Sequence, residues 1–232
     1  MSVKRRGKIV IAAATLIAIV AAIAVSRPNE RDPVYKGHHF SEWLGCFVHY
    51  IDIEKRFNPP TAELRDAVVT VGTTNLQLLT TWIARDTSPT VFDKARQIMP
   101  NWLRRLFKRQ LEAEDYRYET AEGAADAFKL LGVAGTPVIP QLAQTVRIGN
   151  EQARARALRA LVFIGKPALP SLLEIAATPK LGDTRVEAIG FLSQYINDTT
   201  VRIFLANAAT NTNGAVASAA QDALRGENNF GY

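Results

Sequence analysis

Three histidines and a single cysteine, all of them ligand types for a transition metal, lie in one short stretch of this chain. His38, His39, Cys46 and His49 fall within GHHFSEWLGCFVHY, residues 37–50, and the chain has no other histidine or cysteine. A metal site needs three or four converging ligands and outer partners that orient them. A Cys-x-x-His spacing on a helix supplies two ligands at most, and the chain has no HExxH motif. Cys46 and His49 are therefore only weak metal candidates, and we expect no metal.

The same stretch fits the first helix of a larger helical stack better than it fits a catalytic site. Ser41 is a suitable N-cap, and Glu42 in the first turn suits the helix dipole. Apolar residues then recur at helical spacing: Trp43, Leu44, Phe47, Val48 and Ile51. We interpret residues 34–58 as a segment that caps the N-terminal end of the fold and buries Trp43. Cys46 is then a small buried apolar residue.

The charge of the chain gives no indication of nucleic-acid binding. The 232 residues include 28 basic and 22 acidic side chains, for a formal charge of +6. Four basic residues precede the N-terminal apolar run, which leaves 24 basic against 22 acidic side chains, or +2, in the rest. A nucleic-acid-binding domain usually has a stronger basic excess. We therefore expect no nucleic-acid partner, and a composition of 47% hydrophobic residues fits one globular domain.

The N-terminus has the pattern of an export segment. Four basic residues, ending at Lys8, precede an uncharged apolar run over residues 9–25. That run is at the short end of what a membrane span needs, and small residues around Ala24 also offer a cleavage site. We favour a signal anchor over residues 1–26 that crosses the cytoplasmic membrane once and places the body outside the cytoplasm. A cleaved signal peptide and a secreted or periplasmic protein are the alternative, and residues 27–33 form a linker.

Most of the remaining chain repeats a helix pair with a period of 33 residues. AADAFKLLGVAGTPVIPQLAQTV from Ala124 aligns with ALRALVFIGKPALPSLLEIAATP from Ala157, so that Gly132 meets Gly165 and Pro137 meets Pro170. An earlier copy places Gly72 at the same position. We expect each glycine to end the first helix in the left-handed cap conformation and the prolines to begin the second. One pair cannot bury its apolar stripe alone, so the pairs must stack.

At these residues the chain resembles the HEAT-repeat family, including the shorter repeats of phycobilin lyases. PVYKGHHFSEWL, residues 33–44, is also similar to the segment before the repeats in exported HEAT-repeat proteins of Verrucomicrobia. The resemblance implies an all-α fold, a right-handed, armadillo-like α-solenoid of HEAT-like helix pairs. It implies an architecture and a location more than a reaction.

The repeats are expected to occupy residues 59–228, with a short tail at 229–232. The period breaks at about residues 88–118, where we predict an inserted helical pair rather than a degenerate repeat. Within it NWLRRLFKRQ, residues 101–110, places basic residues among apolar ones. We interpret it as a core helix with a solvated basic face, although a membrane-surface helix has the same pattern.

In such a stack the second helices usually line the concave side, and this is where we expect a protein or peptide to bind. The candidate residues form a mildly polar surface with no cluster of charges: Thr80, Thr81, Gln141, Gln144, Thr145, Ser171, Glu174 and Arg202. The first helices form the convex side, which would carry Arg154, Arg156 and Arg159. We find no acid–base pair, nucleophile triad or phosphate loop, and expect no catalytic residue and no cofactor.

These observations favour a non-catalytic, membrane-tethered scaffold that binds a protein outside the cytoplasm. An enzyme or enzyme-accessory role, as in bilin lyases of the HEAT class, is an alternative based on fold resemblance alone. A DNA-binding role, as in HEAT-like alkylpurine glycosylases, fits the weak charge of the body less well.

Overall fold

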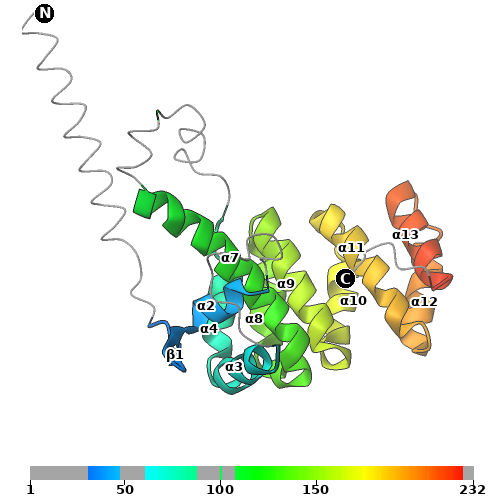
Figure 1. Ribbon diagram of the computed structural model, residues 1–232. Coiled ribbons are helices and arrows are strands. Elements are labelled where there is room, and N and C mark those ends of the chain that lie inside the picture. Colours follow the sequence, from blue (N-terminus) through cyan, green and yellow to red (C-terminus); the bar gives the residue numbers. More distant parts are fainter. Residues whose placement is uncertain (1–30, 48–60, 88–99, 101–107, 227–232) are drawn as a thin grey trace, which may run out of the picture. The chain divides into compact units, whose positions relative to one another are not determined.

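The computed structural model describes residues 31–47, 61–87, 100 and 108–226, and this part of the chain is mostly helical, which confirms the prediction of an all-α protein (Figure 1). Within these ranges no helix is long and apolar enough to cross a membrane. The apolar run at residues 9–25 and most of the linker lie outside the described residues. The described residues from Pro33 onward belong to one compact unit.

A short β-hairpin, which the sequence analysis missed, precedes the first helix. β1 (Val34–Tyr35) pairs antiparallel with β2 (His38–His39). The chain turns through Lys36 and Gly37, whose φ angles are 47° and 83°, as a two-residue hairpin of the type I′ class requires. Two strands of two residues each are too short to produce a visible period of two in the sequence.

The hairpin also determines where the first helix begins, and our assignment of Ser41 as its N-cap was wrong. α2 spans Phe40–Gly45, and the N-cap is His39, whose extended backbone continues β2. Glu42 in the first turn accepts the backbone N–H of His39 at 3.1 Å. Ser41 lies inside the helix, is buried, and shares a hydrogen bond with the hydroxyl of Tyr116. Trp43 is buried as predicted, with 1% of its surface exposed.

The longer helices follow as pairs along the chain. They are α3 (Thr61–Thr74), α4 (Leu76–Ile83), α7 (Lys108–Leu131), α8 (Ile139–Ile148), α9 (Glu151–Ile164), α10 (Leu169–Ala177), α11 (Asp183–Phe191), α12 (Thr199–Ala208) and α13 (Gly214–Leu224). The first helices α7, α9, α11 and α13 pack in succession and form one row in Figure 1. The second helices α8, α10 and α12 form the other row, and each packs against the first helix that follows it.

Glycines end two of the first helices. α7 ends at Leu131 and α9 at Ile164, 33 residues apart, and the glycines that follow have φ angles of 49° at Gly132 and 87° at Gly165. The predicted positive φ is confirmed at both. At Gly165, however, ψ is −143°, so this residue lies in a region accessible essentially to glycine alone rather than in the left-handed helical region. Pro170 is in the first turn of α10, as expected, while Pro137 lies in the 3₁₀ segment η1 (Gly132–Val138) before α8.

Gly72 does not have the cap role that we predicted from its alignment. α3 continues past it to Thr74, and the φ angle of Gly72 is not positive. A Cβ at this position would lie 3.3 Å from both δ-carbons of Leu131 on α7. The absence of a side chain therefore allows α3 and α7 to pack closely, a requirement that comes from a distant part of the chain.

Part of the predicted insertion belongs to a longer helix. α7 begins at Lys108 and runs through residue 118 without a break into the repeat that we expected to start there. Residues 88–99 and 101–107 lie outside the described residues, and so does most of NWLRRLFKRQ. Among the described residues, α7 packs against α2, α3, α4 and α9.

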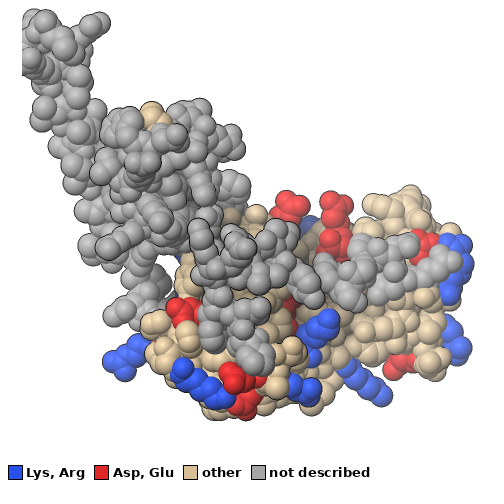
Figure 2. All heavy atoms as spheres, in the orientation of Figure 1, with Lys and Arg blue, Asp and Glu red and all other residues tan. Residues whose placement is uncertain are grey.

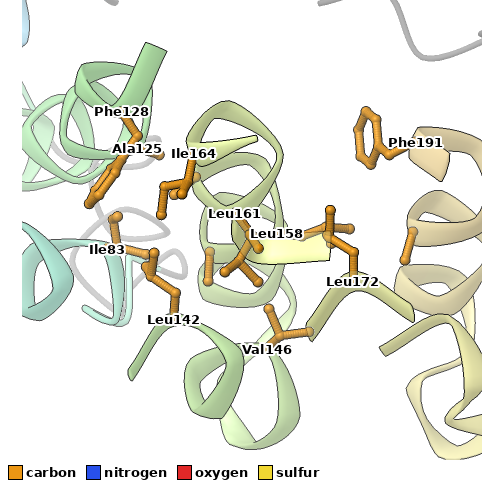
Figure 3. Close-up of a cluster of buried hydrophobic side chains, with 14 of the residues drawn as sticks. Ile83, Ala125, Phe128, Leu142, Val146, Leu158, Leu161, Ile164, Leu172 and Phe191 are labelled. Carbon is orange, nitrogen blue, oxygen red and sulfur yellow. The ribbon is translucent and has the colours of Figure 1, made fainter. Parts of the chain in front are cut away.

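The core runs between the two rows of helices without interruption. Leu158, Leu161 and Ile164 of α9 are at most 2% exposed. Figure 3 shows these side chains among apolar groups from α4, α7, α8 and α10, such as Ile83, Phe128, Leu142 and Leu172. Burial of a side chain of this size contributes about 1.5–3 kcal/mol, so the contacts between pairs are the main source of stability.

Candidate functional site

The histidine and cysteine stretch is a structural junction between the hairpin and α2. The Nδ1 atom of His38 lies 3.2 Å from Oε2 of Glu42. The thiol of Cys46 donates to the carbonyl oxygen of Glu42 at 3.3 Å, and burial, followed by the charge of Glu42, raises the pKa of that thiol. His49 lies outside the described residues. Within the described ranges no group of three or more His, Cys, Asp or Glu side chains could hold a metal ion.

Aromatic and polar contacts attach the hairpin to the rest of the fold. The indole Nε1 of Trp43 donates to the carbonyl oxygen of Tyr35 at 3.2 Å, and the two rings meet edge to face. The hydroxyl of Tyr35 donates to the carboxylate of Asp66 on α3. Asp66 also lies 3.7 Å from the amine of Lys36. These contacts attach the hairpin to α2 and α3.

The predicted binding residues on the second helices are mostly accessible. Thr81, Gln141, Gln144, Glu174 and Arg202 are exposed, and Thr145 and Ser171 are half-buried. Thr80 is a correction, because it is only 7% exposed and its hydroxyl donates to the backbone of its own helix.

The structure adds three residues to this surface. Arg147 of α8 and Glu174 of α10 form an ion pair of 2.7 Å between neighbouring second helices. Two isoleucines are strongly exposed, Ile148 at 73% on α8 and Ile203 at 58% on α12. Ile148 follows Gln144 by four residues, so the same helical spacing could have identified it. We call the accessible residues of α4, α8, α10 and α12 named in these two paragraphs the second-helix face.

The second-helix face has little net charge. Arg147 and Glu174 neutralise one another, and Arg202 is the one further charged residue among those named above. Figure 2 shows both signs of charge on the visible side of the molecule. The arrangement offers hydroxyls, amides and isolated apolar side chains, which suit contacts with a protein surface.

A second polar feature, which we did not predict, lies between α7 and α9. Arg156 of α9 is only 1% exposed, and its Nη1 atom is 3.7 Å from Oε1 of Glu122 on α7. Arg159 donates to the other oxygen of Glu122 at 2.7 Å, and its Nε atom is 3.0 Å from Asp126. We call these four residues the ionic cluster. Burial raises the pKa of Asp126 although Arg159 acts in the opposite direction, and the guanidinium groups stay protonated at neutral pH.

Arg156 also binds the segment that follows α4. Its Nη2 atom donates to the carbonyl oxygen of Arg85 at 2.6 Å, and Nη1 donates to the hydroxyl of Thr87 at 3.0 Å. That hydroxyl donates in turn to Oε1 of Gln152 at 2.5 Å. One buried side chain thus joins residues more than sixty positions away to α9.

The N-cap of α9 makes a further bond to the same segment. The side-chain amide of Asn150 donates to the carboxylate of Asp86 at 2.6 Å, while its oxygen caps α9 by accepting the N–H of Ala153 at 2.8 Å. We call the bonds between residues 85–87 and residues Asn150, Gln152 and Arg156 the α9 clasp. Arg156 lies three residues after buried Ala153 and four residues before buried Ala160. That spacing is a signal from which its burial could have been predicted.

Comparison of the chain with protein-family models, with curated proteins and with solved structures finds no match.

Proposed function

We propose that this protein is a non-catalytic scaffold, built as a right-handed α-solenoid of HEAT-like helix pairs, which binds another protein through its second-helix face. The observation that carries this proposal is the repeated packing. The first helices α7, α9, α11 and α13 pack in succession, and the second helices α8, α10 and α12 each leave part of their surface exposed. Repetition of one unit creates an extended binding surface from many small contributions.

The chemistry of the second-helix face supports a protein partner of low net charge. Exposed isoleucines separated by glutamine, threonine and serine side chains resemble the mixture of apolar anchors and polar surroundings in protein interfaces. The Arg147–Glu174 pair removes charge from the middle of the face. A polyanion such as nucleic acid requires a basic surface instead.

Site-specific photo-crosslinking in cells tests the binding surface. A photoreactive amino acid replaces Gln144 or Ile203 in the full chain, and matched control positions are Ala155 on α9 and Ser218 on α13, which are exposed on the first-helix row. We expect both second-helix positions to capture the same protein and both controls to capture none of it. Equal capture from the two rows, or no specific capture from the second-helix face, would contradict the proposal.

The scaffold is proposed to act outside the cytoplasm, held by residues 9–25 at the cytoplasmic membrane. The basic residues before this apolar run support that orientation. Fractionation of cells that express a C-terminally tagged chain, followed by protease added from outside, tests it. A full-length, membrane-bound and digestible product is expected. A shortened soluble product indicates cleavage near Ala24, and a protected cytoplasmic product would refute the proposed location.

A further inference from the structure

The chain contains one asparagine that is followed by glycine. Asn213 precedes Gly214 at the start of α13, and the sequence has no other Asn-Gly pair. An asparagine side chain loses ammonia when the backbone nitrogen of the next residue attacks its Cγ atom. Glycine favours this attack because it has no Cβ to obstruct the nitrogen and its backbone rotates freely. Both residues are exposed, and a Cβ added at Gly214 would meet no described atom within 4 Å.

The fold holds the Asn213 amide in a geometry that slows this attack. Asn213 is the N-cap of α13, and its Oδ1 atom accepts the N–H groups of Ala215 at 3.1 Å and Val216 at 3.3 Å. Its ψ angle is 112°, which turns the Gly214 nitrogen away from the Cβ side of Asn213. Ring closure requires the nitrogen on that side, so the cap must open and ψ must rotate first. Gly214 is the first residue of the helix, and its own N–H has no acceptor within the helix.

We propose that Asn213 is a site of spontaneous deamidation and that the N-cap of α13 sets its rate. The Gly214 nitrogen gives up its proton to a base in solution and forms a bond to Cγ of Asn213. The bond from Cγ to the side-chain nitrogen breaks, and that nitrogen leaves as ammonia. Water then opens the five-membered imide at either carbonyl carbon. One product is aspartate, and the other is isoaspartate, in which the chain continues through the side-chain carboxyl carbon.

The two products have different consequences for α13. Aspartate is as good an N-cap as asparagine, and its negative charge is favourable at the N-terminus of a helix. Isoaspartate adds one carbon to the backbone just before the helix, so the spacing between the cap and the N–H groups of the first turn changes. α13 packs on α11 and α12 and buries Val216, Ala220 and Ala223. We therefore expect isoaspartate, and not aspartate, to weaken this packing.

Peptide mass spectrometry of the full chain, incubated in mildly alkaline buffer, tests the site. We expect conversion at Asn213 and severalfold less at Asn207, an exposed asparagine of α12 that is followed by alanine. Gly214→Ala should slow the conversion severalfold, because its Cβ obstructs the attack while the open space around it lets the variant fold. In urea, conversion should be at least about fivefold faster than in the folded chain, because the free energy of an asparagine cap corresponds to about this factor.

Three outcomes would overturn the proposal. An unmodified Asn213, or equal conversion at Asn207, would remove the assignment of the site. Equal rates in the folded and the urea-unfolded chain would show that the cap does not set the rate. Asn213→Asp isolates one product and should have at least the Tm of the parent at pH 7, and a lower Tm would contradict the expected effect of aspartate. Asn213 is not part of the second-helix face, so the crosslinking experiment above does not depend on this result.

Discussion

Replacing Gly123 by alanine tests the close crossing of α2 and α7. A Cβ at Gly123 would lie 2.1 Å from the carbonyl oxygen of Leu44 and 2.6 Å from its carbonyl carbon. Both are backbone atoms and cannot move aside by a change of rotamer. To restore ordinary contact at 3.4 Å from 2.1 Å, the two helices must separate by about 1.3 Å.

The cost follows from what α2 buries. Phe40, Trp43 and Leu44 are each at most 1% exposed, and each contributes about 1.5–3 kcal/mol by burial. Separation of the helices loses part of this, and overpacking typically costs about 1–3 kcal/mol. Alanine regains about 1 kcal/mol through its higher helix propensity. We expect a net loss of roughly 2–4 kcal/mol, which lowers Tm by roughly 5–15 °C in a chain of this size.

Thermal unfolding followed by circular dichroism measures this loss, with Gly45→Ala as the matched control. Gly45 belongs to α2 near the same crossing, but a Cβ there would meet only a carboxylate oxygen of Glu119 at 3.8 Å, an ordinary contact. The control should therefore lose no stability and can gain up to about 1 kcal/mol from the higher helix propensity of alanine. A Gly123→Ala protein with an unchanged Tm, or equal losses in both variants, would refute the crossing described here.

Two further substitutions test backbone strain and a half-buried carboxyl group. Gly165→Ala should cost about 1–3 kcal/mol in urea unfolding, because φ is 87° while the nearest atom to an added Cβ is 3.9 Å away; a similar cost for Gly214→Ala, where space is open and φ is not positive, would argue against strain. Burial, and then the charges of Asp183 and Glu151, raise the pKa of Glu187. The folded state thus holds this proton more tightly than the unfolded state, and the free energy of unfolding falls as pH rises from about 4.3 through the raised pKa. Glu187→Gln should therefore raise Tm at pH 7 and leave it unchanged at pH 3, and a lower Tm at pH 7 would contradict this assignment.

The sequence predicted a helix end correctly where the end depends only on the backbone conformation of one residue. Gly132 and Gly165 have positive φ angles, because a helix end favours a residue without a Cβ whatever surrounds it. The same rules failed for Gly72 and Ser41. At position 72 the side chain of Leu131 lies so close that a glycine is favoured. Ser41 lies inside α2 rather than at its N-cap, because the hairpin places His39 at the N-cap. Both errors come from contacts with other parts of the chain.

The exposure of the candidate binding residues was predicted better than the buried polar contacts of α9. Helical spacing alone placed Gln141 and Gln144 on the exposed side of α8, since periodicity separates buried from solvated positions. Periodicity carries no information about which distant residue meets a buried charge. Periodicity therefore did not predict the hydrogen bond between Arg156 and Thr87.

The sequence by itself determined that the chain forms successive helices, that α7 and α9 end at glycines, and which stripe of each helix is apolar. These features depend on residue type and on spacing within one turn of helix. The tertiary structure alone decided that Arg156 is buried, that Gly123 faces the backbone of Leu44, and that residues 85–87 bind α9. Such contacts join positions more than sixty residues apart, and only the packing of one helix pair on another brings them together.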